Sequence, residues 1–248
     1  MAGTSPVVKR WELWEGTHRF HLDGRFMFAR DYVRGLFTSC ALSSLVITWC
    51  VCIGPIIEAS ATLVGLLLYI ATMYLFISAW ATEPGILPSG RGSFLSVQQV
   101  GERAKESRTC DVDGQAVPLK WCRTCHIFRP PRASHCSRCD VCIDRFDHHC
   151  YYMGTCIGGR NYREFVYFMH AMCVLGTYMF ATAAITTYRM MVRHDAGDVA
   201  CVSLLQDPSR PWVQHALCFL TRLSTYCPIN PLWILFVGGW TFCMWMCN

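Results

Sequence analysis

Long uncharged runs separated by polar segments dominate the hydrophobic pattern of the chain. Gly35 to Ile57 and Ala59 to Ala81 each contain 23 residues without a charged side chain, and Phe165 to Tyr188 contains 24. A run of this length forms a helix of about 35 Å, enough to cross a hydrocarbon core of about 30 Å. We therefore expect three transmembrane helices, at residues 35–57, 59–81 and 165–188. The first two should form a hairpin.

A fourth apolar run, Leu232 to Cys247, has 16 residues, fewer than the roughly 20 that a span needs. We expect a fourth transmembrane helix at 229–248 that is truncated or divergent. The chain is thus predicted to be an all-α integral membrane protein with four transmembrane helices and a cytosolic cysteine-rich domain between the second and third. The expected segments are an N-terminal segment (1–34), the hairpin (35–81), a cytosolic insertion (82–164, domain core 120–165), the third helix (165–188), a lumenal loop (189–228) and the fourth helix.

Basic residues are distributed unevenly among the segments between these runs. Six Lys and Arg precede the first run, none lies in the turn of the hairpin, twelve lie between Thr82 and Glu164, and four between Arg189 and Cys227. The positive-inside rule therefore predicts that the N-terminal segment and the insertion face the cytosol. The first 34 residues lack the apolar core of a cleavable signal peptide, so we expect the first helix to start membrane insertion.

Composition narrows the classes of function. With 53% hydrophobic and 16% charged residues, the chain is too apolar for an ordinary soluble or disordered protein. Its net charge of +5 is too small to indicate a dedicated nucleic-acid binder, but it suits anionic lipid head groups. We expect the lipid bilayer as a partner and no nucleic acid.

The chemistry of the chain is concentrated in a cysteine cluster. Seven of the 17 cysteines lie in the 35 residues from Cys122 to Cys156, together with four histidines. Two-residue gaps between cysteines allow both sulfurs to reach one tetrahedral zinc ion. Two closed sites of three cysteines and one histidine use eight ligands, which leaves one cysteine and two histidines outside them.

A spare thiol beside a spare imidazole is the usual arrangement of a nucleophilic cysteine. The spacing alone does not identify the spare cysteine, because Cys142, Cys150 and Cys156 can each be omitted without breaking the first knuckle. Local chemistry favours Cys150, since Asp147 and His148 lie immediately upstream.

The segment from Trp121 to Phe165 resembles the Asp-His-His-Cys cysteine-rich domain of the integral-membrane protein S-acyltransferases, or palmitoyltransferases. Residues 147–150 spell that motif, and Glu83-Pro84-Gly85 stands where the family usually has Asp-Pro-Gly. Residues 129–136 and 159–163 are most similar to the subfamily that includes Ras-modifying enzymes. The resemblance implies transfer of a palmitoyl group from palmitoyl-CoA to cysteines of protein substrates at the cytosolic membrane face, in two steps through an acyl-enzyme.

The resemblance also implies the site residues. It places Cys150 as nucleophile, His148 as general base and Asp147 as the group that orients the imidazole. It implies two structural Zn²⁺ ions, one bound by Cys122, Cys125, His135 and Cys142, the other by Cys136, Cys139, His149 and Cys156. An accessory subunit and an endoplasmic reticulum or Golgi location are further expectations.

Basic residues of the insertion are candidate contacts for the phosphates of acyl-CoA by charge alone. A solvated basic face beside anionic lipid explains the same residues equally well. These residues are Lys120, Arg129, Arg132, Arg160 and Arg163.

The sequence departs from the family pattern in three places. Tyr151-Tyr152 follows Cys150 where the family commonly has Pro-Trp, Thr155 replaces an Asn, and the Thr-Thr-x-Glu motif expected after the fourth span is absent. An inactive family member that keeps the zinc fold and binds partners is therefore the main alternative. A ubiquitin-transfer domain with eight Cys and His ligands is a third hypothesis, but its ligand spacing fits poorly and it has no use for a spare Asp-His-Cys group.

Overall fold

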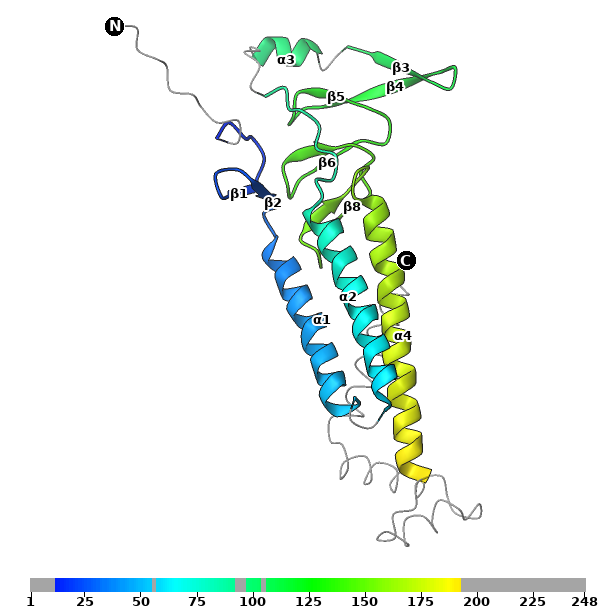
Figure 1. The fold of residues 1–248 in the computed structure, drawn as a ribbon. Coiled ribbons are helices and arrows are strands. Elements are labelled where there is room, and N and C mark those ends of the chain that lie inside the picture. The colour runs from blue at the N-terminus through cyan, green and yellow to red at the C-terminus, as the bar shows by residue number, and fades with distance from the viewer. Residues whose placement is uncertain (1–11, 55–56, 92–96, 104–105, 193–248) are drawn as a thin grey trace, which may run out of the picture. The chain divides into compact units, whose positions relative to one another are not determined.

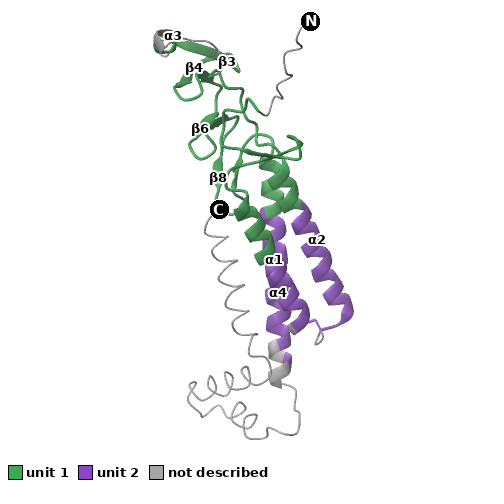
Figure 2. Ribbon diagram, turned by 90° about the vertical axis from the view of Figure 1, so that its left-hand side faces the viewer, with its two compact units in different colours: residues 1–41, 75–168 green, residues 42–74, 169–248 purple. Residues whose placement is uncertain are grey.

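The structure is a computed structural model that describes residues 12–54, 57–91, 97–103 and 106–192. The expected fourth helix, and the expected lumenal loop beyond residue 192, lie outside the described residues. The chain divides into two compact units, residues 1–41 with 75–168 and residues 42–74 with 169–248 (Figure 2).

Three described helices are long and apolar enough to cross a membrane, namely α1 (Val33–Cys52), α2 (Ala59–Ala81) and α4 (Tyr162–Val192), labelled in Figure 1. The bounds of α2 coincide with those expected from its uncharged run. Helix α1 ends at Cys52 rather than at residue 57, since Gly54 and Pro55 follow, and both residue types disfavour a helix interior. Helix α4 begins at Tyr162 and so includes the polar residues Arg163 and Glu164 ahead of the apolar run.

Apolar and small residues hold the second unit together. Its buried cluster combines Val46 and Trp49 of α1, and Ile53 just after it, with Leu175, Met179 and Ala183 of α4. The indole Nε1 of Trp49 donates to Thr182 Oγ1 at 3.1 Å, and Tyr178 Oη donates to the carbonyl of Ala61 on α2 at 2.6 Å. Such bonds between helices are the usual supplement to apolar packing inside a membrane.

The first unit contains the cysteine-rich domain, and here the expectation of an all-α protein is wrong. The domain is built of short antiparallel strands: β3 (Arg108–Val112), β4 (Gln115–Cys122) and β5 (Ile127–Arg129) form one sheet, and two hairpins follow, β6 (Ser134–Cys136) with β7 (Val141–Ile143) and β8 (His148–Cys150) with β9 (Thr155–Ile157). Strands of three residues are too short to show a period of two, so the hydrophobic pattern did not reveal them. A short helix, α3 (Val97–Arg103), precedes the sheet.

Both segments that flank the first helical hairpin pack on the cysteine-rich domain within this unit. The N-terminal segment forms its own hairpin, β1 (Arg19–His21) with β2 (Phe26–Phe28), and Thr17 N donates to the carbonyl of Cys139 at 3.0 Å. After α2, Leu87 N donates to the carbonyl of Cys142 at 2.8 Å. Trp14 and Ile86 pack on the buried cluster around Val141 and Ile143. The knuckles are thereby fixed to chain segments far away in sequence.

Candidate functional site

Strand pairing assembles the first group of metal ligands. The side chains of Cys122, Cys125, His135 and Cys142 converge so that their ligand atoms all lie within 4.8 Å of one another. His135 faces Cys142 across the β6–β7 ladder, and its Nδ1 lies 3.3 Å from Cys125 Sγ and 3.9 Å from Cys142 Sγ. Sulfur and nitrogen bound to one tetrahedral zinc ion are about 3.6 Å apart, so this arrangement fits the ion.

The second group is built in the same way one hairpin later. Cys136, Cys139, His149 and Cys156 also have all ligand atoms within 4.8 Å of one another. The three sulfurs lie 3.4 to 3.6 Å from Nδ1 of His149, which faces Cys156 across the β8–β9 ladder. All three cysteines are buried. This second group therefore fits a tetrahedral zinc ion as well.

The chemistry of the donor atoms also fits a cation. Hydrogen bonds from Cys139 and Cys156 lower the pKa of the Cys136 thiol, while its hydrogen bond with Cys136 raises the pKa of Cys139 to about 12. Without a metal, these crowded sulfurs must therefore share protons. A divalent cation removes that conflict, because it binds all of them as thiolates.

A carboxylate lies behind the histidine of the first group. Asp140 Oδ1 is 3.6 Å from His135 Nε2, the nitrogen that faces away from the sulfurs. Asp140 is itself held by Arg91 at 2.7 Å, and the same guanidinium donates to Cys125 Sγ at 3.4 Å. Carboxylates in this position fix the tautomer and orientation of a ligand histidine.

The second group has an equivalent carboxylate from a distant segment. Asp31 Oδ2, just before α1, lies 3.5 Å from His149 Nε2 and 3.1 Å from Arg138 Nη1. Sequence reasoning missed both Asp31 and Asp140. Asp140 could have been noticed as an acid inside a Cys-x2-Cys knuckle, but nothing in the sequence links Asp31 to His149 across 118 residues.

Cys150 lies outside both groups, as the ligand count left open. It ends β8 and is 6% exposed, and its thiol is the largest influence that raises the pKa of the neighbouring His148 imidazole. Asp147 Oδ2 lies 2.8 Å from His148 Nδ1 and also raises its pKa. The His148 ring packs edge-on against Phe165 of α4, with 5.4 Å between centroids. The structure thus places Asp147, His148 and Cys150 together at β8, and adds Phe165 as a neighbour in contact with the imidazole.

The basic residues proposed from charge lie on several elements. Lys120 and Arg129 are paired across the β4–β5 ladder, and Arg132 adopts a positive φ of 65° in the turn before β6. Arg160 forms an ion pair with Glu83, and Arg163 pairs with Glu164 at 3.3 Å.

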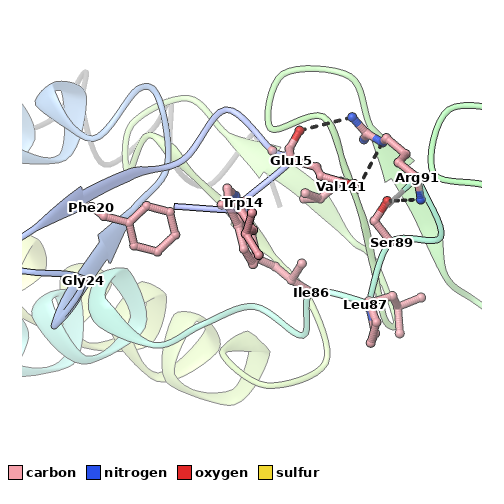
Figure 3. A pocket seen from close by; sticks show the side chains of 12 residues that line it. Trp14, Glu15, Phe20, Gly24, Ile86, Leu87, Ser89, Arg91 and Val141 are labelled. Carbon is pink, nitrogen blue, oxygen red and sulfur yellow. Dashed lines mark hydrogen bonds and ion pairs between the residues drawn. The ribbon is translucent and has the colours of Figure 1, made fainter. Parts of the chain in front are cut away.

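A separate cavity of about 570 Å³ lies beside the first metal group (Figure 3). Its apolar wall includes Trp14, Phe20, Ile86 and Val141, while Arg91 forms its polar edge. None of Asp147, His148 and Cys150 is among the residues that line it. The cavity therefore belongs to the contact between the N-terminal segment and the knuckles, not to the spare thiol.

The described part of the chain has three helices of membrane-spanning length, two Cys3His groups that fit zinc, and a cysteine outside both groups next to an Asp–His pair. These features define a membrane protein with a cysteine-rich, metal-binding domain. The family model of the DHHC palmitoyltransferases matches residues 115–248, and the chain belongs to this family.

Relatives with curated names match most of the chain. It is 32% identical over 240 residues to palmitoyltransferase ZDHHC9 of Danio rerio, covering 89% of this chain and 60% of the relative. It is 32% identical over 240 residues to palmitoyltransferase ZDHHC18-A of Danio rerio (90% and 50%) and 31% identical over 237 residues to palmitoyltransferase ZDHHC14 of Mus musculus (87% and 46%). The chain spans about half the length of the curated relatives it matches.

Proposed function

We propose that this protein is a protein S-acyltransferase that moves a palmitoyl group from palmitoyl-CoA to cysteines of protein substrates through an acyl-Cys150 intermediate. The observation that carries the proposal is the position of Cys150. It is the one cysteine between residues 122 and 156 outside the two Cys3His groups, and it lies two residues after His148, whose pKa its thiol raises. Family membership and the names of the relatives support the same activity.

In the first half-reaction, His148 accepts the proton of the Cys150 thiol, and the thiolate attacks the thioester carbonyl of palmitoyl-CoA. Asp147 holds Nδ1 of His148, so Nε2 is the nitrogen left for the thiol. The new bond joins Cys150 Sγ to the acyl carbon. The bond from that carbon to the CoA sulfur breaks, and CoA leaves with the proton from His148.

In the second half-reaction, the thiol of the substrate protein gives its proton to His148 and attacks acyl-Cys150. The thioester to Cys150 breaks, and the Cys150 thiolate recovers its proton from the imidazole. One base serves both steps, since each step exchanges one thiol for another. The Asp147 carboxylate stabilises the imidazolium that forms in both.

The zinc ions have a structural role in this proposal. Zinc ligated by Cys122, Cys125, His135 and Cys142, and by Cys136, Cys139, His149 and Cys156, would cross-link hairpins that have little apolar core of their own. Because β8 carries both His149 and Cys150, the second site fixes the strand on which the nucleophile sits.

We further propose that the cysteine-rich domain faces the cytosol, on the charge distribution given above, and that the protein resides in the endoplasmic reticulum or Golgi. The subfamily resemblance motivates the organelle and an accessory subunit. Membrane fractionation, together with protease protection of an epitope inserted in the β3–β4 turn, tests the location and the orientation.

Self-acylation tests the enzymatic proposal. Purified protein in detergent is incubated with alkyne-tagged palmitoyl-CoA, and the label is challenged with hydroxylamine, which cleaves thioesters. We expect hydroxylamine-sensitive label on the wild type and none on Cys150→Ser. Cys110→Ser serves as the matched control, since Cys110 is a free, half-buried thiol of β3. Equal label on Cys150→Ser and wild type would remove Cys150 from the mechanism, and a zinc-loaded wild type without label would favour the inactive alternative.

A further inference from the structure

The loop that follows Cys150 is held by the start of α1. Residues 151–154 connect β8 to β9, and residues 31–38 of the same compact unit contact them. The guanidinium Cζ of Arg34 lies 3.9 Å from the ring centroid of Tyr151. One turn later, Thr38 Oγ1 donates to the carbonyl of Tyr152 at 2.7 Å, and Thr38 is buried.

The two backbones also approach more closely than side chains would allow. A Cβ added to Gly35 would lie 2.8 Å from the carbonyl oxygen of Met153. A Cβ added to Gly154, whose φ is +64°, would lie 2.0 Å from the carbonyl oxygen of Asp31. Glycine at both positions permits this contact, and Gly154 also permits the left-handed turn. Four residues of the sequence therefore support the contact between these two segments: Arg34, Gly35, Thr38 and Gly154.

These contacts from α1 matter because Tyr151 directly follows Cys150. Proline, which the family pattern has at this position, fixes its own φ, whereas Tyr151 has no ring that does so. A thiol must stay aligned with its base and with the thioester carbon for efficient attack, and displacements of about 1 Å reduce rates strongly. A cation stacked on the Tyr151 ring and a hydrogen bond to the next carbonyl restrict the loop from outside.

We propose that Arg34 and Thr38 are positioning residues for Cys150, which hold Tyr151 and Tyr152 and thereby align the thiol with His148. The proposal rests on the function proposed above and adds the start of α1 to the machinery of that site. Neither residue touches the reacting atoms. Their effect is on the loop that directly follows Cys150.

Hydrogen exchange tests the hold independently of acyl transfer. Peptides covering residues 150–156 are compared in the wild type, Arg34→Ala and Thr38→Val. We expect faster exchange of the loop amides in both variants, with two zinc ions per chain retained. Arg108→Ala is the matched control, because Arg108 also stacks on an aromatic ring, Phe128 at 4.7 Å, but on the β3–β5 sheet. Unchanged exchange in both variants would overturn the proposal.

Steady-state kinetics test whether the contacts of Arg34 and Thr38 with the loop increase the rate of acylation of Cys150. We expect kcat for acylation of Cys150 to fall about two- to tenfold in either variant, the size of an exposed cation–π contact or one hydrogen bond, with the KM for palmitoyl-CoA unchanged. Tyr151→Phe keeps an aromatic ring under the Arg34 guanidinium and should lose less kcat than Arg34→Ala. In a Tyr151→Leu background, Arg34→Ala should cause no further loss.

The outcomes separate the positioning role from the proposed function. A rise in KM at constant kcat would mean that Arg34 binds the donor, and it would overturn the positioning role. A folded, zinc-loaded wild type that takes no label contradicts the proposed function and, with it, the catalytic part of this proposal. A labelled wild type whose variants keep normal kcat contradicts the positioning role alone.

Discussion

The carboxylate of Asp140 should raise the zinc affinity of the first site and leave that of the second site unchanged. It lies 3.6 Å from His135 Nε2 and is held by Arg91 at 2.7 Å. Asp140→Asn removes the charge but keeps the shape, and asparagine tolerates the positive φ of 56° at this position. Loss of such a partner lowers metal affinity about 10- to 100-fold. Because the contact is longer than a hydrogen bond and the carboxylate is one-third exposed, we expect the lower end, about tenfold.

The assay is zinc release to a chromogenic chelator at several chelator concentrations. The wild type should release two zinc ions slowly, and Asp140→Asn should release one of them about ten times faster while the other keeps the wild-type rate. The matched control is Asp113→Asn, because Asp113 has a similar positive φ of 52° but lies exposed in the β3–β4 turn. Release of both ions at the wild-type rate, or equal acceleration of both, would refute the role assigned to Asp140.

Three further predictions each concern one residue and its contacts. Asn161→Ala removes three hydrogen bonds of a fully buried amide, to Ala79, Cys156 and Gly158. It should lower the free energy of unfolding by about 3 kcal/mol, measured by thermal unfolding in detergent. A loss below about 1 kcal/mol would contradict this expectation. Asp147→Asn should slow self-acylation about 10- to 100-fold with the zinc content unchanged, and a normal rate would exclude the orienting role. Gly154→Ala should destabilise the loop by at least about 1 kcal/mol, because both the positive φ of Gly154 and its close contact with Asp31 exclude a side chain. The change should appear as faster hydrogen exchange of the amides after Cys150. Exchange at the wild-type rate would contradict this packing.

The sequence predicts those features that depend on composition or on local spacing. Helix α2 has the bounds of its uncharged run because charge alone limits a span. Cysteine gaps of two residues and the ligand count predict two Cys3His sites, the family resemblance assigns eight side chains to them, and the structure brings those eight together in two groups. In both cases the deciding information lies within a few dozen residues.

Features set by tertiary contact escaped the sequence analysis. The short strands have no period long enough to detect, and their register appears only once His135 faces Cys142 across a ladder. The carboxylate behind His149 comes from Asp31, and the hold on Tyr151 comes from Arg34. Neither pair can be inferred without knowing that the start of α1 packs on the β8–β9 hairpin.

The central claim is that eight Cys and His side chains bind zinc while Cys150 alone carries the acyl group. Native mass spectrometry of the purified protein after incubation with palmitoyl-CoA tests both halves at once, when followed by digestion and mapping of the adduct. The account predicts molecules that carry two zinc ions and one palmitoyl group, with the group on Cys150. Palmitoyl found on another cysteine of the cluster, or only on molecules that have lost zinc, would contradict it.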